Sequence, residues 1–244
     1  MASVDTLSLA YQTAKALAGV LDGLAKVLPL AQAEALQARA TVYKISAVLA
    51  PRITSVAQVA VIGQTFAAAV LALAVDLEPT DAAPAFATAA AAAAGSVPTF
   101  ASPALTRAGA LGRMLAACAE AALLGQSFVA EAQSDFVDRP GAIAARARIA
   151  AAMDGATDRI AAAAGQDVVG LLTEVANTSS AHIATLATDL KPLIQVETLR
   201  SAPSSVLAWE LYGDPERGAD LVGRNLSMTP LFMPTKIVAL APGS

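Results

Sequence analysis

Histidine, cysteine and aromatic residues are scarce in this sequence. Its 244 residues include one histidine, one cysteine and one tryptophan, and aromatic residues make up 4%. A zinc site usually needs several Cys or His ligands, and an internal disulfide needs two cysteines. The sequence therefore predicts no metal site, no disulfide within the chain and no cofactor. Cys118 lies in an apolar helical pattern and is interpreted as a buried, inert thiol.

Catalytic motifs are also missing. The sequence has no P-loop and no Gly-x-Gly-x-x-Gly pattern after a strand. His182 is the only candidate for a histidine base, and a place in the core or at a helix cap explains it better. Asp154 and Asp158 are four residues apart, and we interpret them as a solvated helix face rather than a metal site. We therefore predict no catalytic residues and no enzyme.

Charge is scarce and slightly negative. Charged residues make up 15% of the chain, and the net charge is −4. A DNA-binding domain normally carries a basic stripe. The nearest approach to one, Arg146, Arg148 and Arg159, is interrupted by Asp154 and Asp158. We therefore expect no direct binding of nucleic acid.

Alanine and other hydrophobic residues dominate instead, at 56% of the chain, and the mean hydropathy is +0.57. Alanine has the highest helix propensity but buries little area per residue. The expected fold class is mainly α, an elongated Ala-rich helical bundle whose exposed apolar faces favour association in several copies. Apolar spacing and punctuation predict helices over 5–28, 29–50, 52–76, 82–94, 103–137 and 138–164.

Local signals add detail to this pattern. Thr80 is a predicted N-cap, and Gly112 and Gly125 indicate close packing or a bend inside a helix. Gly165 and Gly170 are expected to interrupt the segment that follows residue 164. The sequence 177–180 (Asn-Thr-Ser-Ser) is predicted to form a turn.

The run over 52–76 is the most apolar part of the chain. Nineteen residues from Ala57 to Val75 carry no formal charge, which reaches the lower limit for a membrane span. Polar residues at Gln58, Gln64 and Thr65 interrupt it. A buried core helix is the favoured interpretation, and a membrane segment or an oligomer interface are the alternatives.

Composition changes near residue 190, with Pro192 as punctuation, so we expect domains at 1–187 and 188–244. In the second, Pro203–Tyr212 and Pro215–Gly223 are predicted helices, 193–196 an extended segment, and Ile237–Leu240 a strand. Between the helices, Gly213 suits a left-handed C-cap, Asp214 an N-cap and Pro215 the first helical position. Asn225 is expected to end the second helix in the left-handed conformation.

Residues 188–244 resemble the C-terminal end of the DNA circularisation protein N family of Mu-like phages, a baseplate component of contractile tails, and also the second half of a LysM-type module. In that family a Pro-Ser-Leu-Val-Leu-Ala-Tyr-x-Leu-Tyr-Gly-Asp pattern precedes a short helix, an Arg-Asn pair and a Pro-x-Phe-x-Pro run. The residues that match are Pro203, Val206, Leu207, Ala208, Trp209, Leu211, Tyr212, Gly213, Asp214, Leu221, Val222, Arg224, Asn225, Pro230, Phe232 and Pro234. The family's glycine turn after the last proline is replaced by Thr235-Lys236, and where the family has a β-rich N-terminal domain we expect Ala-rich helices here.

The resemblance implies a small LysM-like α/β docking module and a structural virion protein of a contractile tail. It implies a place as a baseplate hub or hub-adjacent adaptor, in several copies, with other tail and baseplate proteins as partners. The expected location is the tail baseplate of the virion, and the host cytoplasm during assembly. The alternative is a membrane-associated or membrane-active helical protein that uses residues 52–76.

The candidate site residues belong to this terminal module and serve either partner docking or the module core. Trp209 and Tyr212 are favoured as core residues with Phe232 packed on them, and protein docking or glycan binding are the alternatives. For Arg224 three partners stay open, namely Asp214, Asp220 or another protein. The complete set of candidates is Trp209, Tyr212, Gly213, Asp214, Arg224, Asn225 and Phe232.

Overall fold

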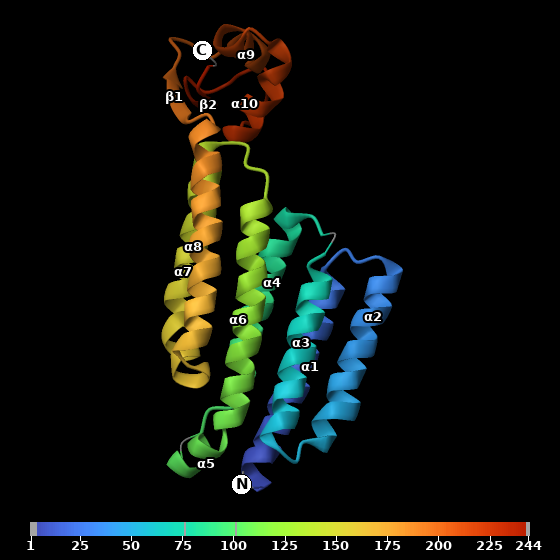
Figure 1. Ribbon diagram of the computed structural model, residues 1–244. Coiled ribbons are helices and arrows are strands. Elements are labelled where there is room, and N and C mark those ends of the chain that lie inside the picture. Colours follow the sequence, from blue (N-terminus) through green and yellow to red (C-terminus); the bar gives the residue numbers. More distant parts are fainter. Residues whose placement is uncertain (1–3, 76, 101, 243–244) are drawn as a thin grey trace. The chain divides into compact units, whose positions relative to one another are not determined.

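The computed structural model describes residues 4–75, 77–100 and 102–242, and it is mainly helical, as the sequence predicts (Figure 1). The chain forms two compact units. One contains Met1–Asp135 and Arg146–His182, and the other contains Phe136–Ala145 and Ile183–Ser244. The division differs from the expected 1–187 and 188–244 because residues 136–145 and 183–187 join the C-terminal unit.

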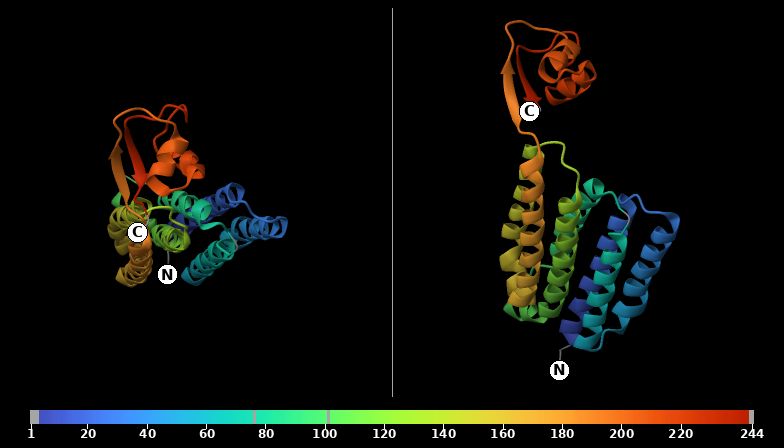
Figure 2. Two further views of the ribbon diagram at one scale, coloured as in Figure 1. Left: turned by 90° about the horizontal axis from the view of Figure 1, so that it is seen from above. Right: turned by 45° about the horizontal axis from the view of Figure 1, so that its top comes forward.

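The first unit is a bundle of long helices that lie side by side (Figures 1 and 2). The segment after α2 continues as a π-helical turn, η1 (Lys44–Leu49), and a 3₁₀ turn, η2 (Ala50–Arg52). Helices α7 and α8 contribute residues 146–182 to this unit. The helices are α1 (Val4–Val27), α2 (Gln32–Tyr43), α3 (Val56–Leu73), α4 (Pro79–Ala94), α5 (Pro103–Ala108), α6 (Ala110–Gln133), α7 (Arg139–Ala164) and α8 (Gln166–Asp189).

Helix α6 is the centre of this bundle and packs against α1, α3 and α4. A Cβ on Gly112 would lie 2.6 Å from Oγ1 of Thr13, so only glycine allows α1 to approach this closely. The buried Ser127 hydroxyl donates a hydrogen bond to the carbonyl of Ala83 on α4, at 2.9 Å. The close contact predicted at Gly112 is confirmed, whereas a Cβ on Gly125 would meet nothing within 4 Å.

Helix α3 buries one face and exposes the other. Its buried residues are Val59, Ile62, Phe66, Val70 and Leu73, at the three-four spacing of a core-facing stripe. On the opposite side, Val61 and Leu71 are exposed. The core interpretation of the 52–76 run is therefore correct for one face only.

Tertiary packing and backbone chemistry correct several local predictions in the helical region. Helix α4 begins at Pro79, which needs no N–H in the first turn, and Thr80 is not its N-cap. The helix expected over 103–137 is two helices separated at Gly109. Residues 177–180 continue α8 instead of turning, because Ala176, Ser179 and Ile183 bury one helical face. Gly165 breaks the chain at φ 93°, but Gly170 lies within α8.

The second unit contains a small α/β module after the end of α8. Strands β1 (Leu193–Glu197) and β2 (Lys236–Leu240) pair antiparallel, with Gln195 opposite Val238. Between them lie α9 (Ser204–Tyr212), the 3₁₀ turn η3 (Pro215–Arg217) and α10 (Gly218–Arg224). Ile194 and Val196 pack against its buried core, which consists of Leu207, Ala208, Leu221, Met233, Ile237 and Ala239.

The junction between α9 and η3 has the predicted caps. Gly213 is left-handed at φ 71° and its N–H donates to the carbonyl of Trp209 at 2.8 Å. The carboxylate of Asp214 accepts a hydrogen bond from the N–H of Glu216 at 2.9 Å. Asn225 ends α10 as its C-cap, as predicted, but it is not left-handed: its φ is −99°, and Leu226 takes the left-handed conformation instead, at φ 47°.

We expect Gly213→Val to destabilise the module more than Gly213→Asn. A Cβ at this position meets nothing within 4 Å, so the left-handed backbone alone decides the difference. Asn tolerates this conformation and a β-branched residue does not, which corresponds to about 1 kcal/mol or more. Urea unfolding followed by the fluorescence of Trp209 measures it. Equal free energies of unfolding for the two variants would contradict the role of Gly213 as a left-handed cap.

Candidate functional site

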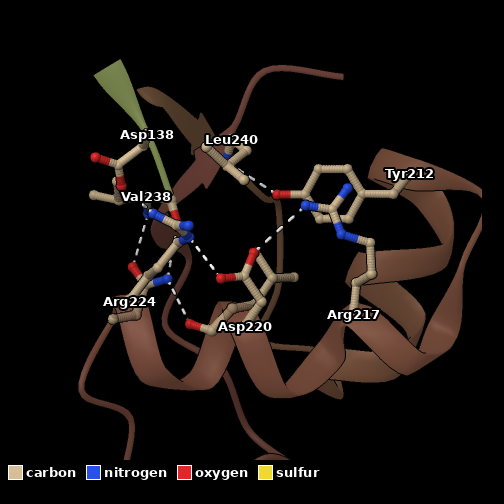
Figure 3. A network of polar contacts seen from close by, with 9 residues as sticks. Asp138, Tyr212, Arg217, Asp220, Arg224, Val238 and Leu240 are labelled. Atoms are coloured by element: carbon tan, nitrogen blue, oxygen red, sulfur yellow. Dashed lines mark hydrogen bonds and ion pairs between the residues drawn. The ribbon is translucent and has the colours of Figure 1, made fainter. Parts of the chain in front are cut away.

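Arg224 is the centre of a polar network in the second unit (Figure 3). Its Nε donates to Asp220 Oδ1 and its Nη1 to Asp138 Oδ2, both at 2.7 Å. The Arg224 side chain is only 13% exposed. Of the partners considered from the sequence, the structure selects Asp220 and not Asp214. Asp138, which lies 86 residues away, was not anticipated because sequence spacing gives no signal for such a contact.

Asp138 fixes the start of α7 to the module. Its Oδ1 accepts the N–H of Gly141 at 2.9 Å. Burial opposes its ionisation, but the hydrogen bonds from Arg224 and Gly141 and the charge of Arg224 outweigh burial, so the pKa of Asp138 lies below its ordinary value. Beside it, Arg139 Nε donates to the carbonyl of Ala187 at 3.0 Å, which ties the same segment to the last turn of α8.

Tyr212 and Asn225 hold the outer edge of β2. The hydroxyl of Tyr212 accepts the N–H of Leu240 at 3.0 Å, and the guanidinium of Arg217 lies 3.7 Å from the centre of its ring. Asn225 Oδ1 accepts the N–H of Val238 at 2.7 Å, and its Nδ2 donates to the carbonyl of Val238 at 2.9 Å. The Asn225 side chain thus takes the place of a neighbouring strand.

Trp209 and Phe232 lie on the surface of the module, at 61% and 70% exposed. The favoured interpretation, in which Trp209 and Tyr212 form the core with Phe232 packed on them, is therefore wrong for Trp209 and Phe232. The core is filled by smaller aliphatic side chains, and Tyr212 is only partly buried at its border. The sequence could not distinguish these two faces of α9, because both carry apolar residues.

Each exposed aromatic has an exposed apolar residue near it in the chain, Val206 for Trp209 and Leu231 for Phe232. Val206 and Trp209 are three residues apart on α9 and share a helical face. The N–H of Ser204 donates to the carbonyl of Pro230 at 2.7 Å, so the loop with Leu231 and Phe232 runs beside the start of α9. We refer to Val206, Trp209, Leu231 and Phe232, all exposed, as the apolar surface of the module.

In the first unit, two arginines of α7 pair with glutamates of α6. Arg148 Nε and Nη2 lie 2.6 and 2.7 Å from the two carboxylate oxygens of Glu131. Arg159 makes the same kind of bidentate contact with Glu120. Both glutamates are buried. The hydrogen bonds to these glutamates raise the pKa of both arginines, against the effect of burial. Two of the three arginines considered as a basic stripe therefore form ion pairs that join α7 to α6.

His182 and Cys118 are the other titratable residues that the sequence singles out. His182 is exposed on α8, so its assignment to the core or to a helix cap is wrong. Burial raises the pKa of the half-buried Cys118 thiol, which favours the unreactive form. Among the residues that the structure describes, no three His, Cys, Asp or Glu side chains gather as metal ligands would. Two helices, Val56–Leu73 and Ala110–Gln133, are long and apolar enough for a membrane span by length and composition alone.

No protein-family model matches this chain, and no curated protein has a matching sequence. A functional assignment therefore depends on the residue pattern of the terminal module and on the surface that it presents.

The Asp138–Arg224 contact predicts a specific pH dependence. We expect Asp138→Asn to lower the free energy of unfolding at pH 7 by about 1.5–3 kcal/mol, the usual range for hydrogen bonds to charged groups. Because the pKa of Asp138 is depressed in the folded state, its stabilisation is full above the unfolded pKa of about 3.9. It is lost as the pH falls through the folded value, so the difference between the two proteins should shrink in acid.

Urea unfolding at a series of pH values measures this difference. Asp154→Asn is the matched control, since Asp154 is an exposed aspartate near the middle of α7, and we expect it to change stability little at any pH. A difference between Asp138→Asn and the parent protein that stays constant from pH 7 to pH 3 would contradict the electrostatic role of Asp138.

Proposed function

We propose that this chain is a structural virion protein of a contractile phage tail, acting as a baseplate hub or hub-adjacent adaptor. Its terminal module docks on a neighbouring tail protein, and its helical unit packs in or around the hub. The chain is present in several copies, and it works by binding rather than by catalysis.

The observation that carries the proposal is the exposure of Trp209 and Phe232. Both belong to the pattern shared with the tail family, yet neither fills the module core. Aromatic residues are the commonest anchors of protein interfaces, and each buries about 150–250 Å² when covered. Residues of this pattern that are not needed for folding are the natural candidates for docking.

The other residues of the pattern support the same division of roles. Gly213 and Asp214 cap helices, Tyr212 on α9 and Asn225 at the end of α10 bind β2, and Arg224 pairs with Asp220 and Asp138. These side chains shape the module, and the apolar surface beside them is presented by α9 and by the loop around Phe232. The LysM-like character of the module belongs to this proposal and follows from the resemblance.

The alternative function is membrane association, and the exposed face of α3 is the observation in its favour. Val56, Val61 and Leu71 are exposed on a helix without a charged residue. The buried stripe on the opposite face of the same helix argues for the bundle, since its five large apolar side chains already pack in a protein core.

We expect the chain to be found in purified tail particles. The gene is deleted from the prophage or phage that carries it, and the deletion is complemented with variants. Particles are isolated on a density gradient, and the chain is quantified by mass spectrometry. Trp209→Ala with Phe232→Ala should lower its amount in particles at least about tenfold, as expected for the loss of two interface anchors.

Leu171→Ala is the matched control, because Leu171 is equally exposed at 67% but lies on α8 in the helical unit. It should leave incorporation unchanged. Absence of the parent chain from particles would overturn the tail assignment. Full incorporation of the double variant would overturn only the role of the apolar surface.

Liposome flotation tests the membrane alternative. We expect the purified chain to stay in the soluble fraction with vesicles of neutral or anionic phospholipid. If it floats, Leu71→Gln adds a polar group to the exposed face of α3 and shows whether this face or the apolar surface of the module binds the vesicle. Flotation that this change abolishes would support the membrane function over the tail function.

A further inference from the structure

The two edges of the β1–β2 sheet differ in how many of their outward backbone groups are hydrogen-bonded. The outer edge of β2 is occupied, because Asn225 binds both backbone groups of Val238 and Tyr212 binds the N–H of Leu240. A strand edge with free backbone groups is a template for pairing with another chain, and proteins usually block it. On β2 these contacts occupy the N–H and C=O of Val238 and the N–H of Leu240.

The outer edge of β1 is identified by the same contacts. In an antiparallel pair, opposite residues either exchange both backbone hydrogen bonds or turn both groups away. Val238 turns both groups to Asn225, so its partner Gln195 turns its own N–H and C=O away from β2. The same alternation directs the backbone groups of Leu193 and Glu197 outward.

This outer edge carries no blocking device. Within the described part of the chain, no hydrogen bond reaches the outward groups of Leu193, Gln195 or Glu197. The free edge begins just after Lys191, whose carbonyl accepts the N–H of Arg139 at 3.2 Å. It contains no proline and no lysine, and its central side chain, Gln195, is exposed and uncharged.

We propose that β1 is a self-association site, at which a second copy of this chain adds its own β1 antiparallel, centred on Gln195. In this register Gln195 faces Gln195 of the copy, and Leu193 faces Glu197, so all three outward residues exchange backbone hydrogen bonds. The contact is isologous, with one two-fold axis through the Gln195 pair. Two two-stranded sheets become one sheet of four strands.

The side chains of β1 fit a copy of themselves. Ile194 of one copy stands directly opposite Val196 of the other, in the closely spaced pair that favours β-branched contacts, and symmetry repeats this contact. Both side chains are only partly buried and already pack against the module core. Their free sides would extend that core across the two-fold axis.

Charge does not oppose the pairing. The only charged residue of β1, Glu197, is neutralised by Lys236 at 2.8 Å on β2. In the proposed register the two copies of Glu197 lie at opposite ends of the contact, about 13 Å apart along the strand at 3.3 Å per residue. The proposal goes beyond the tail assignment and does not rest on it, since the purified chain alone is sufficient for the test.

Disulfide crosslinking tests the register. In a Cys118→Ser background, Gln195→Cys places a thiol opposite its own copy, at a Cα separation of about 5.5 Å that a disulfide can span. Glu197→Cys is the matched control, exposed on the same strand but too far from its copy to be bridged. Under mild oxidation we expect a covalent dimer with Gln195→Cys and little with Glu197→Cys. Equal crosslinking, none, or more with Glu197→Cys would overturn the proposal.

Sedimentation equilibrium of the parent chain and two variants tests the backbone pairing. Gln195→Pro removes an outward N–H without touching the ladder to β2, whereas Gln195→Thr keeps it. We expect Gln195→Pro to raise the dissociation constant of self-association at least about tenfold, since symmetry removes the bond twice, and Gln195→Thr to preserve it. Trp209 fluorescence checks that both variants fold. A monomeric parent chain, or a folded Gln195→Pro variant that associates as the parent does, would overturn the proposal.

Discussion

The ion pairs of Arg224 are the contact on which the C-terminal unit depends. A guanidinium that is 13% exposed must find its charge and hydrogen bonds inside the protein, and Asp138 and Asp220 supply both. Asp220 lies one turn away on α10, but Asp138 comes from the start of α7. This single residue therefore joins two distant parts of the chain. It explains why residues 136–145 belong to the terminal unit, which a division of the sequence at residue 188 does not capture.

Alanine imposes a second constraint on the helical unit. Alanine side chains bury little area, so the bundle gains less from apolar burial than a Leu-rich one. It compensates with close approach at Gly112, with the buried bond from Ser127 to Ala83, and with glutamates buried against arginines of α7. A protein with so few charges also leaves apolar side chains at its surface, such as Val61 and Leu71 on α3. Such a surface suits a component of an assembly.

Features controlled by adjacent residues could be predicted from the sequence. The Gly213-Asp214-Pro215 junction follows from the φ preference of glycine, the capping carboxylate and the missing N–H of proline, and no distant contact competes with them. Prediction failed where packing or long-range pairing decides. Residues 177–180 favour a turn locally, but burial of Ser179 keeps them helical. The sequence favours Trp209 and Tyr212 as the core with Phe232 packed on them, whereas aliphatic residues fill the core and only Tyr212 packs at its border.

Asn225 stabilises the module and also blocks strand pairing at the outer edge of β2. By binding both backbone groups of Val238, its side chain ends the sheet on the β2 side without another strand. A two-stranded sheet is marginally stable in water, and the module supports its sheet with α9 and α10 on one face. A further strand is favoured beside β1, because Asn225 and Tyr212 occupy the backbone groups of Val238 and the N–H of Leu240 on β2. The residues that stabilise the isolated module therefore also determine the direction in which its sheet can grow, and a copy that adds its own β1 supplies the strands that a two-stranded sheet lacks.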